Sequence, residues 1–167
     1  QQRLGITTLF VTHDQQEAMA IADRIAVMRA GRLIQQGEPA QVYLAPADAF
    51  VSTFLGTTNR LAVRRSADGA PLVLGRPVPL ADPSVESVHI RPEHLHLELL
   101  GAASERPAER APTSMPHACA RVVGLSFQGA LTRVTLECGT ETLVVDVPSV
   151  DAGSLRLGDV ADVSVRG

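Results

Sequence analysis

Hydrophobic and polar residues follow one pattern up to about residue 58 and a different one beyond it. Residues 6–12 (ITTLFVT) form an almost continuous run of apolar and β-branched side chains. Such a run is typical of a strand buried on both faces of a parallel sheet. Asp14 follows with Glu17 three residues on, which is a capping-box pattern and predicts a helix through residues 18–22. The first part of the chain is therefore expected to be α/β.

Two strands and two short helices are predicted before the pattern changes. Residues 24–29 (RIAVMR) and 32–36 (RLIQQ) read as the two strands of a hairpin, with Ala30 and Gly31 in the turn. A proline near the start and a glycine at the end are helix boundary signals. They predict one helix from Pro39 to Leu44 and another that begins near Asp48 and stops at Gly56.

Beyond residue 58 the chain consists of short β-like runs separated by Gly, Pro and Asp turns. Several short strands at this spacing predict a barrel or a sandwich rather than βαβ units. Residues 101–116, rich in Ala, Pro, Ser, Glu and Arg, read as a mobile loop between two groups of strands. The predicted strands lie within residues 61–65, 71–75, 78–80, 88–90, 94–100, 120–128, 131–138, 142–147 and 160–165.

The basic residues exclude some kinds of active site, and the lack of export signals bears on the state of the cysteines. All 15 basic residues are arginine, so the sequence holds no phosphate-binding loop that ends in Gly-Lys-Ser/Thr and no lysine nucleophile. No apolar run approaches the ~20 residues that a membrane-spanning helix needs, and nothing reads as a signal peptide. Cys119 and Cys138 are accordingly expected to be reduced thiols in a cytosolic protein.

Residues 10–18 (FVTHDQQEA) and 22–28 (ADRIAVM) closely resemble ABC ATPases just beyond their Walker B strand. Residues 31–56 resemble the subgroup that serves maltose, polyamine, ferric-iron and sulfate importers. Subunits of that subgroup end in an OB-like β-domain, the transport-associated OB-like (TOBE) domain. The resemblance implies that residues 1–58 are an α/β remnant of the ABC nucleotide-binding domain and that residues 59–167 are an all-β, OB-like TOBE barrel.

The same resemblance assigns roles to two adjacent residues. His13 matches the switch histidine, which contacts the γ-phosphate of ATP, and Asp14 matches a position that can contact the nucleotide across the dimer. Without the resemblance, His13 reads as a surface histidine, and Asp14 and Glu17 read as helix caps. The sequence has no Walker A, Q-loop, signature or Walker B motif. ATP and Mg²⁺ are therefore expected in a complete subunit, whereas this chain alone is expected to bind no cofactor and to hydrolyse no ATP.

Three short segments resemble parts of the TOBE domain: residues 59–61 (NRL), 89–93 (HIRPE) and 158–160 (GDV). In the second, Arg91 and Glu93 flank Pro92, which biases the residue before it to extended geometry. Arg91 and Glu93 have two interpretations that the sequence leaves open. They form a polar contact at a subunit interface or small-solute site, or they form an ion pair at the end of a strand, which stabilises little if exposed.

Metal ions and nucleic acids are not expected as ligands. His94 and His96 share one face of a predicted strand, but neither they nor His89 and His117 have supporting cysteine or histidine spacing. Beyond residue 60 the acidic residues outnumber the arginines, and Phe127 is the only aromatic residue in this part of the sequence. Binders of single-stranded nucleic acid need aromatic platforms and a positive groove.

Two hypotheses for the function follow. The first is the C-terminal part of the ATP-hydrolysing subunit of an ABC importer, cytoplasmic and peripheral on the inner face of the membrane. Its partners would be a second copy, paired through the β-domain, and the membrane-spanning permease subunits. The alternative is a non-enzymatic regulatory module that binds a small anion or a transported solute.

Overall fold

The structure, a computed structural model, describes residues 5–82, 84–101 and 118–166. The chain divides into two compact units, Gln1–Gly56 and Thr57–Gly167, and each is described by itself. Most of the described residues with regular structure lie in β-strands, and the helices are short. None of the helices in these ranges is long and apolar enough to cross a membrane. The loop predicted at residues 101–116 lies outside the described residues beyond Gly101.

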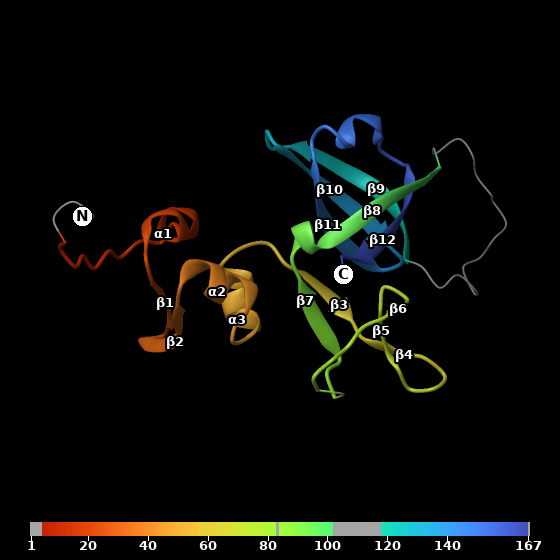
Figure 1. Cartoon of the computed structure of the whole chain (residues 1–167). Coiled ribbons are helices and arrows are strands. Elements are labelled where there is room, and N and C mark those ends of the chain that lie inside the picture. The colour runs from red at the N-terminus through yellow and green to blue at the C-terminus, as the bar shows by residue number, and fades with distance from the viewer. Residues whose placement is uncertain (1–4, 83, 102–117, 167) are drawn as a thin grey trace. The chain divides into compact units, whose positions relative to one another are not determined.

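The first unit contains one hairpin and three short helices, as the sequence predicts. The turn residues of the hairpin, Ala30 and Gly31, have φ values of 48° and 75°. Positive φ at both central positions suits the right-handed twist of the two strands. The elements, shown in Figure 1, are α1 (Gln15–Ile21), β1 (Ile25–Arg29), β2 (Arg32–Gly37), α2 (Pro39–Leu44) and α3 (Ala49–Phe54).

A small aliphatic cluster holds this first unit together. Its buried members come from the hairpin, from α2 and from α3: Ile25, Val27, Val42, Val51 and Leu55. Helix α3 begins at Asp48, whose side chain accepts a hydrogen bond of 2.8 Å from the Val51 amide. The cap satisfies one of the backbone donors that a helix leaves unpaired at its start.

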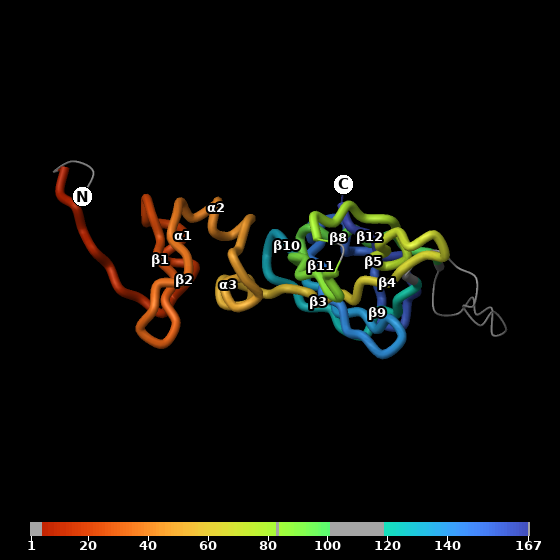
Figure 2. The backbone as a smooth tube through the Cα atoms, turned by 90° about the horizontal axis from the view of Figure 1, so that it is seen from below, coloured from red at the N-terminus to blue at the C-terminus, as the bar shows by residue number. Residues whose placement is uncertain are grey.

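The predicted strand at residues 6–12 is wrong, because these residues adopt no regular structure. A strand forms only where a neighbouring strand pairs with its backbone groups, and none of the described residues provides one. The segment runs extended in the red part of Figure 2. Leu9 and Val11 keep 91% and 86% of their surface exposed.

The second unit is built from β-strands in three sheets. The largest sheet has five antiparallel strands in the order β11-β10-β9-β12-β8. Its strands are β8 (Leu95–Gly101), β9 (Ala118–Phe127), β10 (Leu131–Cys138), β11 (Glu141–Pro148) and β12 (Val160–Val165). The two edge strands, β8 and β11, lie close to each other, so the sheet is strongly curved.

Two small sheets complete this unit. One pairs β3 (Asn59–Ala62) with β7 (Ser87–Ile90). The other joins β4 (Arg64–Arg65), β5 (Pro71–Val73) and β6 (Arg76–Pro77). The strand predicted at residues 78–80 is wrong, because the two-residue turn at Leu74 and Gly75 makes Arg76 and Pro77 the partners of β5 instead. Short 3₁₀ turns lie at η1 (Pro92–His94) and η2 (Ala152–Ser154).

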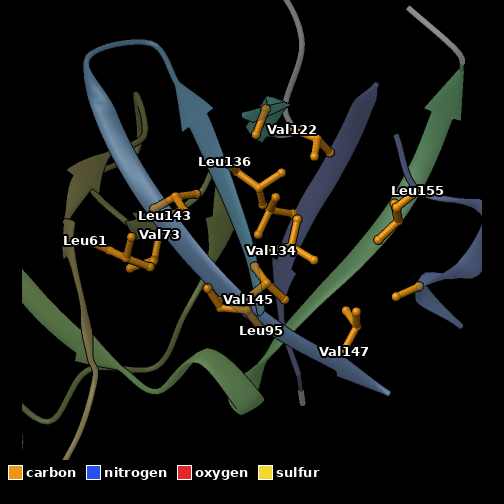
Figure 3. Packing of buried hydrophobic residues seen from close by; sticks show 13 residues of the cluster. Leu61, Val73, Leu95, Val122, Val134, Leu136, Leu143, Val145, Val147 and Leu155 are labelled. Carbon is orange, nitrogen blue, oxygen red and sulfur yellow. The ribbon is translucent and has the colours of Figure 1, made fainter. Parts of the chain in front are cut away.

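The core of the second unit is aliphatic (Figure 3). One row of facing residues runs across three strands, with Leu136 of β10 between Val122 of β9 and Leu143 of β11. All three side chains are at most 1% exposed. Leu61 of β3 and Val73 of β5 belong to the same cluster. The small sheets therefore cover part of the large one.

An ion pair connects the β5–β6 hairpin with the large sheet. The guanidinium of Arg76 donates to the carboxylate of Asp162 on β12 across 2.7 Å. Leu74, in the turn that precedes Arg76, has a φ of 52°, which is unfavourable for a residue with a branched side chain. Its side chain packs against the aliphatic core, and this burial offsets the strain of the turn.

The central position of Leu136 leads to a prediction for stability. Leu136→Ala removes a fully buried side chain and should lower the free energy of unfolding of this unit by about 2–5 kcal/mol. Leu157→Ala removes a side chain that is 63% exposed and serves as the control, with an expected change within about 0.5 kcal/mol. Urea unfolding followed by far-UV circular dichroism measures both. Equal midpoints for the two variants would contradict this description of the core.

Candidate functional site

The residues Thr12, His13 and Asp14 form a corner before helix α1. Asp14 is the N-cap of the helix, and its carboxylate accepts a hydrogen bond of 3.0 Å from the Glu17 amide. The Asp14 amide donates to the Thr12 hydroxyl across 3.0 Å. That hydroxyl in turn donates to the Glu17 carboxylate across 3.3 Å. The helix cap predicted from the sequence is confirmed, and Thr12, two residues before Asp14, adds a hydrogen bond to it.

His13 is exposed between these two anchored neighbours. The hydrogen bonds of Thr12 and Asp14 fix the backbone on both sides of it. The imidazole can therefore act as a donor or an acceptor from a defined position at the start of a helix.

A small pocket of about 70 Å³ adjoins the corner. Thr12, His13 and Asp14 lie on its rim, and apolar side chains such as Met19 and Phe54 line the rest. Pockets that enclose a drug-sized ligand have volumes of about 300–1,000 Å³. The pocket is too small for a nucleotide, so these residues would provide only one side of a nucleotide site.

Arg91 and Glu93 lie at the joint between β7 and η1. The backbone of Arg91 is extended (φ −66°, ψ 146°), as the sequence predicts for a residue before proline. Its side chain is only 5% exposed, and its guanidinium donates to the Thr57 carbonyl across 3.2 Å. Glu93 follows as a half-buried residue of η1. The burial of Arg91 favours a role within the domain over a contact on an open surface.

Arg133 and Asp146 form a charge pair that was not predicted from the sequence. Two hydrogen bonds of 2.8 Å join the guanidinium to the two carboxylate oxygens. Asp146 is buried, and a further guanidinium nitrogen of Arg133 donates to the Thr57 hydroxyl across 3.1 Å. The sequence did contain a signal for this pair, namely the length of the loop between the two strands. A two-residue loop at Gly139 and Thr140 fixes the register of the β10–β11 hairpin and places Arg133 opposite Asp146.

Of the histidines beyond residue 80, the three that the structure describes do not form a metal-binding group. His94 lies in η1 and His96 in β8, so the prediction that they share one strand face is wrong. Pro92 starts a 3₁₀ turn there, and the strand begins one residue after His94. His89 lies on β7, and His117 lies outside the described residues. Within residues 5–82, 84–101 and 118–166, no three His, Cys, Asp or Glu side chains are placed to hold a metal ion.

The comparisons with known proteins agree with these features. Residues 88–166 match the TOBE domain family. Over 166 residues, 98% of this chain and 45% of the relative, the chain is 31% identical to the Fe(3+) ions import ATP-binding protein FbpC of Yersinia enterocolitica. It is 42% identical over 142 residues to the sulfate/thiosulfate import ATP-binding protein CysA 2 of Chromobacterium violaceum, which covers 81% of this chain and 36% of the relative. The chain belongs to the ATP-binding subunits of ABC importers and corresponds to their C-terminal, TOBE-containing region.

A third relative has a higher identity to this chain, but only over a short segment. The spermidine/putrescine import ATP-binding protein PotA of Fusobacterium nucleatum is 64% identical over 56 residues, or 34% of this chain and 15% of the relative. The chain thus spans less than half the length of these three curated relatives. The fold expected from the resemblance is confirmed in part. The structure is mostly β, has a few short helices and contains a TOBE domain.

The two cysteines of the TOBE region differ in exposure. Cys119 is exposed, whereas Cys138 is half-buried against the aliphatic core. Burial raises the pKa of the Cys138 thiol, and the nearby Glu141 adds to the shift. A thiol with a raised pKa forms less thiolate at a given pH, and the thiolate is the reactive form.

We therefore predict that iodoacetamide at about pH 8 alkylates Cys119 at least ~10 times faster than Cys138. Because the pKa of Cys138 is raised, its reaction should become appreciable only at higher pH. Mass spectrometry after a timed pulse measures each site. The same pulse in concentrated urea provides the control, since unfolding should make the two rates similar. Similar rates in the folded protein would show that Cys138 is not protected.

Proposed function

We propose that this chain is the C-terminal part of the ATP-hydrolysing subunit that energises an ABC importer. One observation carries the proposal: the exposed His13 is held between two hydrogen-bonded neighbours at the start of α1, in a chain that resembles import ATP-binding proteins throughout. In a complete subunit that carries the other nucleotide motifs, His13 would contact the γ-phosphate of Mg²⁺-ATP. Asp14 would cap the helix and contact the nucleotide across the dimer.

The chemistry of phosphoryl transfer supports this role for His13. The protein contributes chiefly by positioning the reactants and by stabilising charge on the oxygens of the transferred group. An imidazole N–H can donate to one of these oxygens and can orient the attacking water. A fixed position is essential for both tasks, and the cap formed by Thr12 and Asp14 provides it.

The partners follow from the same proposal. The subunit would bind the permease subunits of the importer and act in the cytoplasm, peripheral to the inner face of the membrane. The three relatives are named for sulfate/thiosulfate, Fe(3+) ions and spermidine/putrescine. Because these solutes differ in charge and size, the similarity does not assign one of them to this chain.

We also propose that two copies of the chain form a homodimer through the TOBE region. In this proposal the TOBE region is an OB-like barrel. Two-fold pairing is the commonest closed arrangement of identical subunits. Large apolar side chains are exposed around the β9–β10 turn, where Phe127 is 76% and Leu131 is 41% exposed. Val150, at 89%, lies close by because the Ser149 amide donates to the Ala130 carbonyl. A second copy of this surface would remove these side chains from water.

The first test of the proposal is His13→Ala in a complete subunit. ATP hydrolysis should fall by about two orders of magnitude, the scale on which loss of one donor to a developing anion acts. Nucleotide affinity should change little, because the variant loses contact with the γ-phosphate and not with the base. His94→Ala, at an exposed position of the TOBE region, is the control. Turnover equal to that of the unmodified subunit would refute the assignment of His13.

The second test concerns self-association. Light scattering at micromolar concentration should show a dimer for the chain, and deletion of residues 1–55 should preserve it. The deletion removes the exposed apolar residues of the segment 6–12, which could otherwise associate nonspecifically. Phe127→Asp should weaken the dimer, whereas Leu44→Asp, at an exposed leucine outside the TOBE region, should not. A monomer after the deletion would show that the TOBE region is not the contact.

A further inference from the structure

Three residues at the start of the second unit are hydrogen-bonded to groups from distant parts of the sequence. Thr57, Thr58 and Asn59 follow directly on the boundary at Gly56. Their partners lie between 31 and 85 positions further along the chain. A connecting segment is normally more mobile than the elements that it joins. Here the β-domain fixes the conformation of this segment.

Two arginines hold Thr57. Arg133 donates to its hydroxyl across 3.1 Å, and Arg91 donates to its carbonyl across 3.2 Å. The fork-like pairing with Asp146 leaves the Arg133 guanidinium little freedom to turn away. The Arg133 guanidinium is therefore positioned by the domain before it meets Thr57.

Asn59 replaces a neighbouring strand at the edge of the large sheet. Its side-chain amide donates to the Val144 carbonyl across 2.7 Å, and its side-chain oxygen accepts from the Val144 amide across 2.7 Å. This pair of bonds has the donor and acceptor pattern of a β-bridge. The same side chain lies within 3.4 Å of the Ile90 carbonyl on β7 and is only 4% exposed. Asn59 thereby connects the edge strand β11 with the small β3–β7 sheet.

We propose that residues 57–59 are a clasp that locks the incoming chain onto β7, β10 and β11. The clasp acts as a conformational device, because any displacement of the chain that reaches Gly56 is passed to these strands and is not absorbed in a flexible linker. Arg91, the arginine of the HIRPE segment, is a positioning residue in this device. The inference concerns this chain alone and does not depend on the proposed transport function.

Hydrogen exchange of the full chain, followed by mass spectrometry of its peptides, tests the clasp. Thr57→Val removes the hydroxyl that Arg133 contacts but keeps a β-branched side chain at an exposed position. We expect exchange in a peptide covering residues 55–62 to quicken about twofold to tenfold, because one hydrogen bond to a charged group is lost. Peptides from β9 and β12 should keep their rates. Thr142→Val, at an exposed position of β11, is the matched control and should change none of these rates.

Asn59→Ala provides the second, stronger variant. It should quicken exchange in the same peptide more than Thr57→Val does, and it should also expose the Val144 amide of β11. Unchanged exchange at residues 55–62 in Thr57→Val would overturn the proposal. An equal increase in every peptide would overturn it too, because the bonds would then support the whole domain and not the incoming segment.

Discussion

The TOBE region depends on the burial of one row of aliphatic side chains, with Leu136 between Val122 and Leu143. Beyond residue 60 the chain has a single aromatic residue, and this one is exposed, so the core is filled by aliphatic side chains, chiefly valine and leucine. In a flat sheet these aliphatic side chains would remain in contact with water. Strong curvature brings the edge strands β8 and β11 together, and the two small sheets cover part of what remains. Each of these features reduces the apolar surface in contact with water.

Hairpin loops then determine which polar groups meet on the outer face. The two-residue loop at Gly139 and Thr140 sets the register of β10 and β11, so that Arg133 lies opposite Asp146. This pair in turn directs the Arg133 guanidinium toward Thr57, which is 76 positions away in sequence. The local geometry of one turn thereby positions the start of the domain. Asn59 adds the bond to the edge strand that the sheet itself does not provide.

The helix caps were predicted correctly, whereas two predicted strands, at residues 6–12 and 78–80, do not form. The caps at Asp14 and Asp48 were predictable because a helix cap needs only residues within one turn. Residues 6–12 looked like a buried strand, but a strand needs a partner, and the pattern cannot supply one. The resemblance assigned a role to His13, and this role stays a prediction; the structure shows an exposed side chain. The buried Arg91 and the Arg133–Asp146 pair depend on three-dimensional contacts, although hairpin register alone would have predicted the latter.

The central claim is that the TOBE region of this importer subunit forms its own core and holds its own first residues. A ¹H–¹⁵N correlation spectrum of residues 57–167 expressed alone tests this claim most directly. The account predicts well-dispersed amide signals that coincide with those of the same residues in the full chain, including Asn59 and Val144. Collapsed dispersion, or large shifts throughout β9, β10 and β11, would show that the core requires residues 1–56 and would contradict the account.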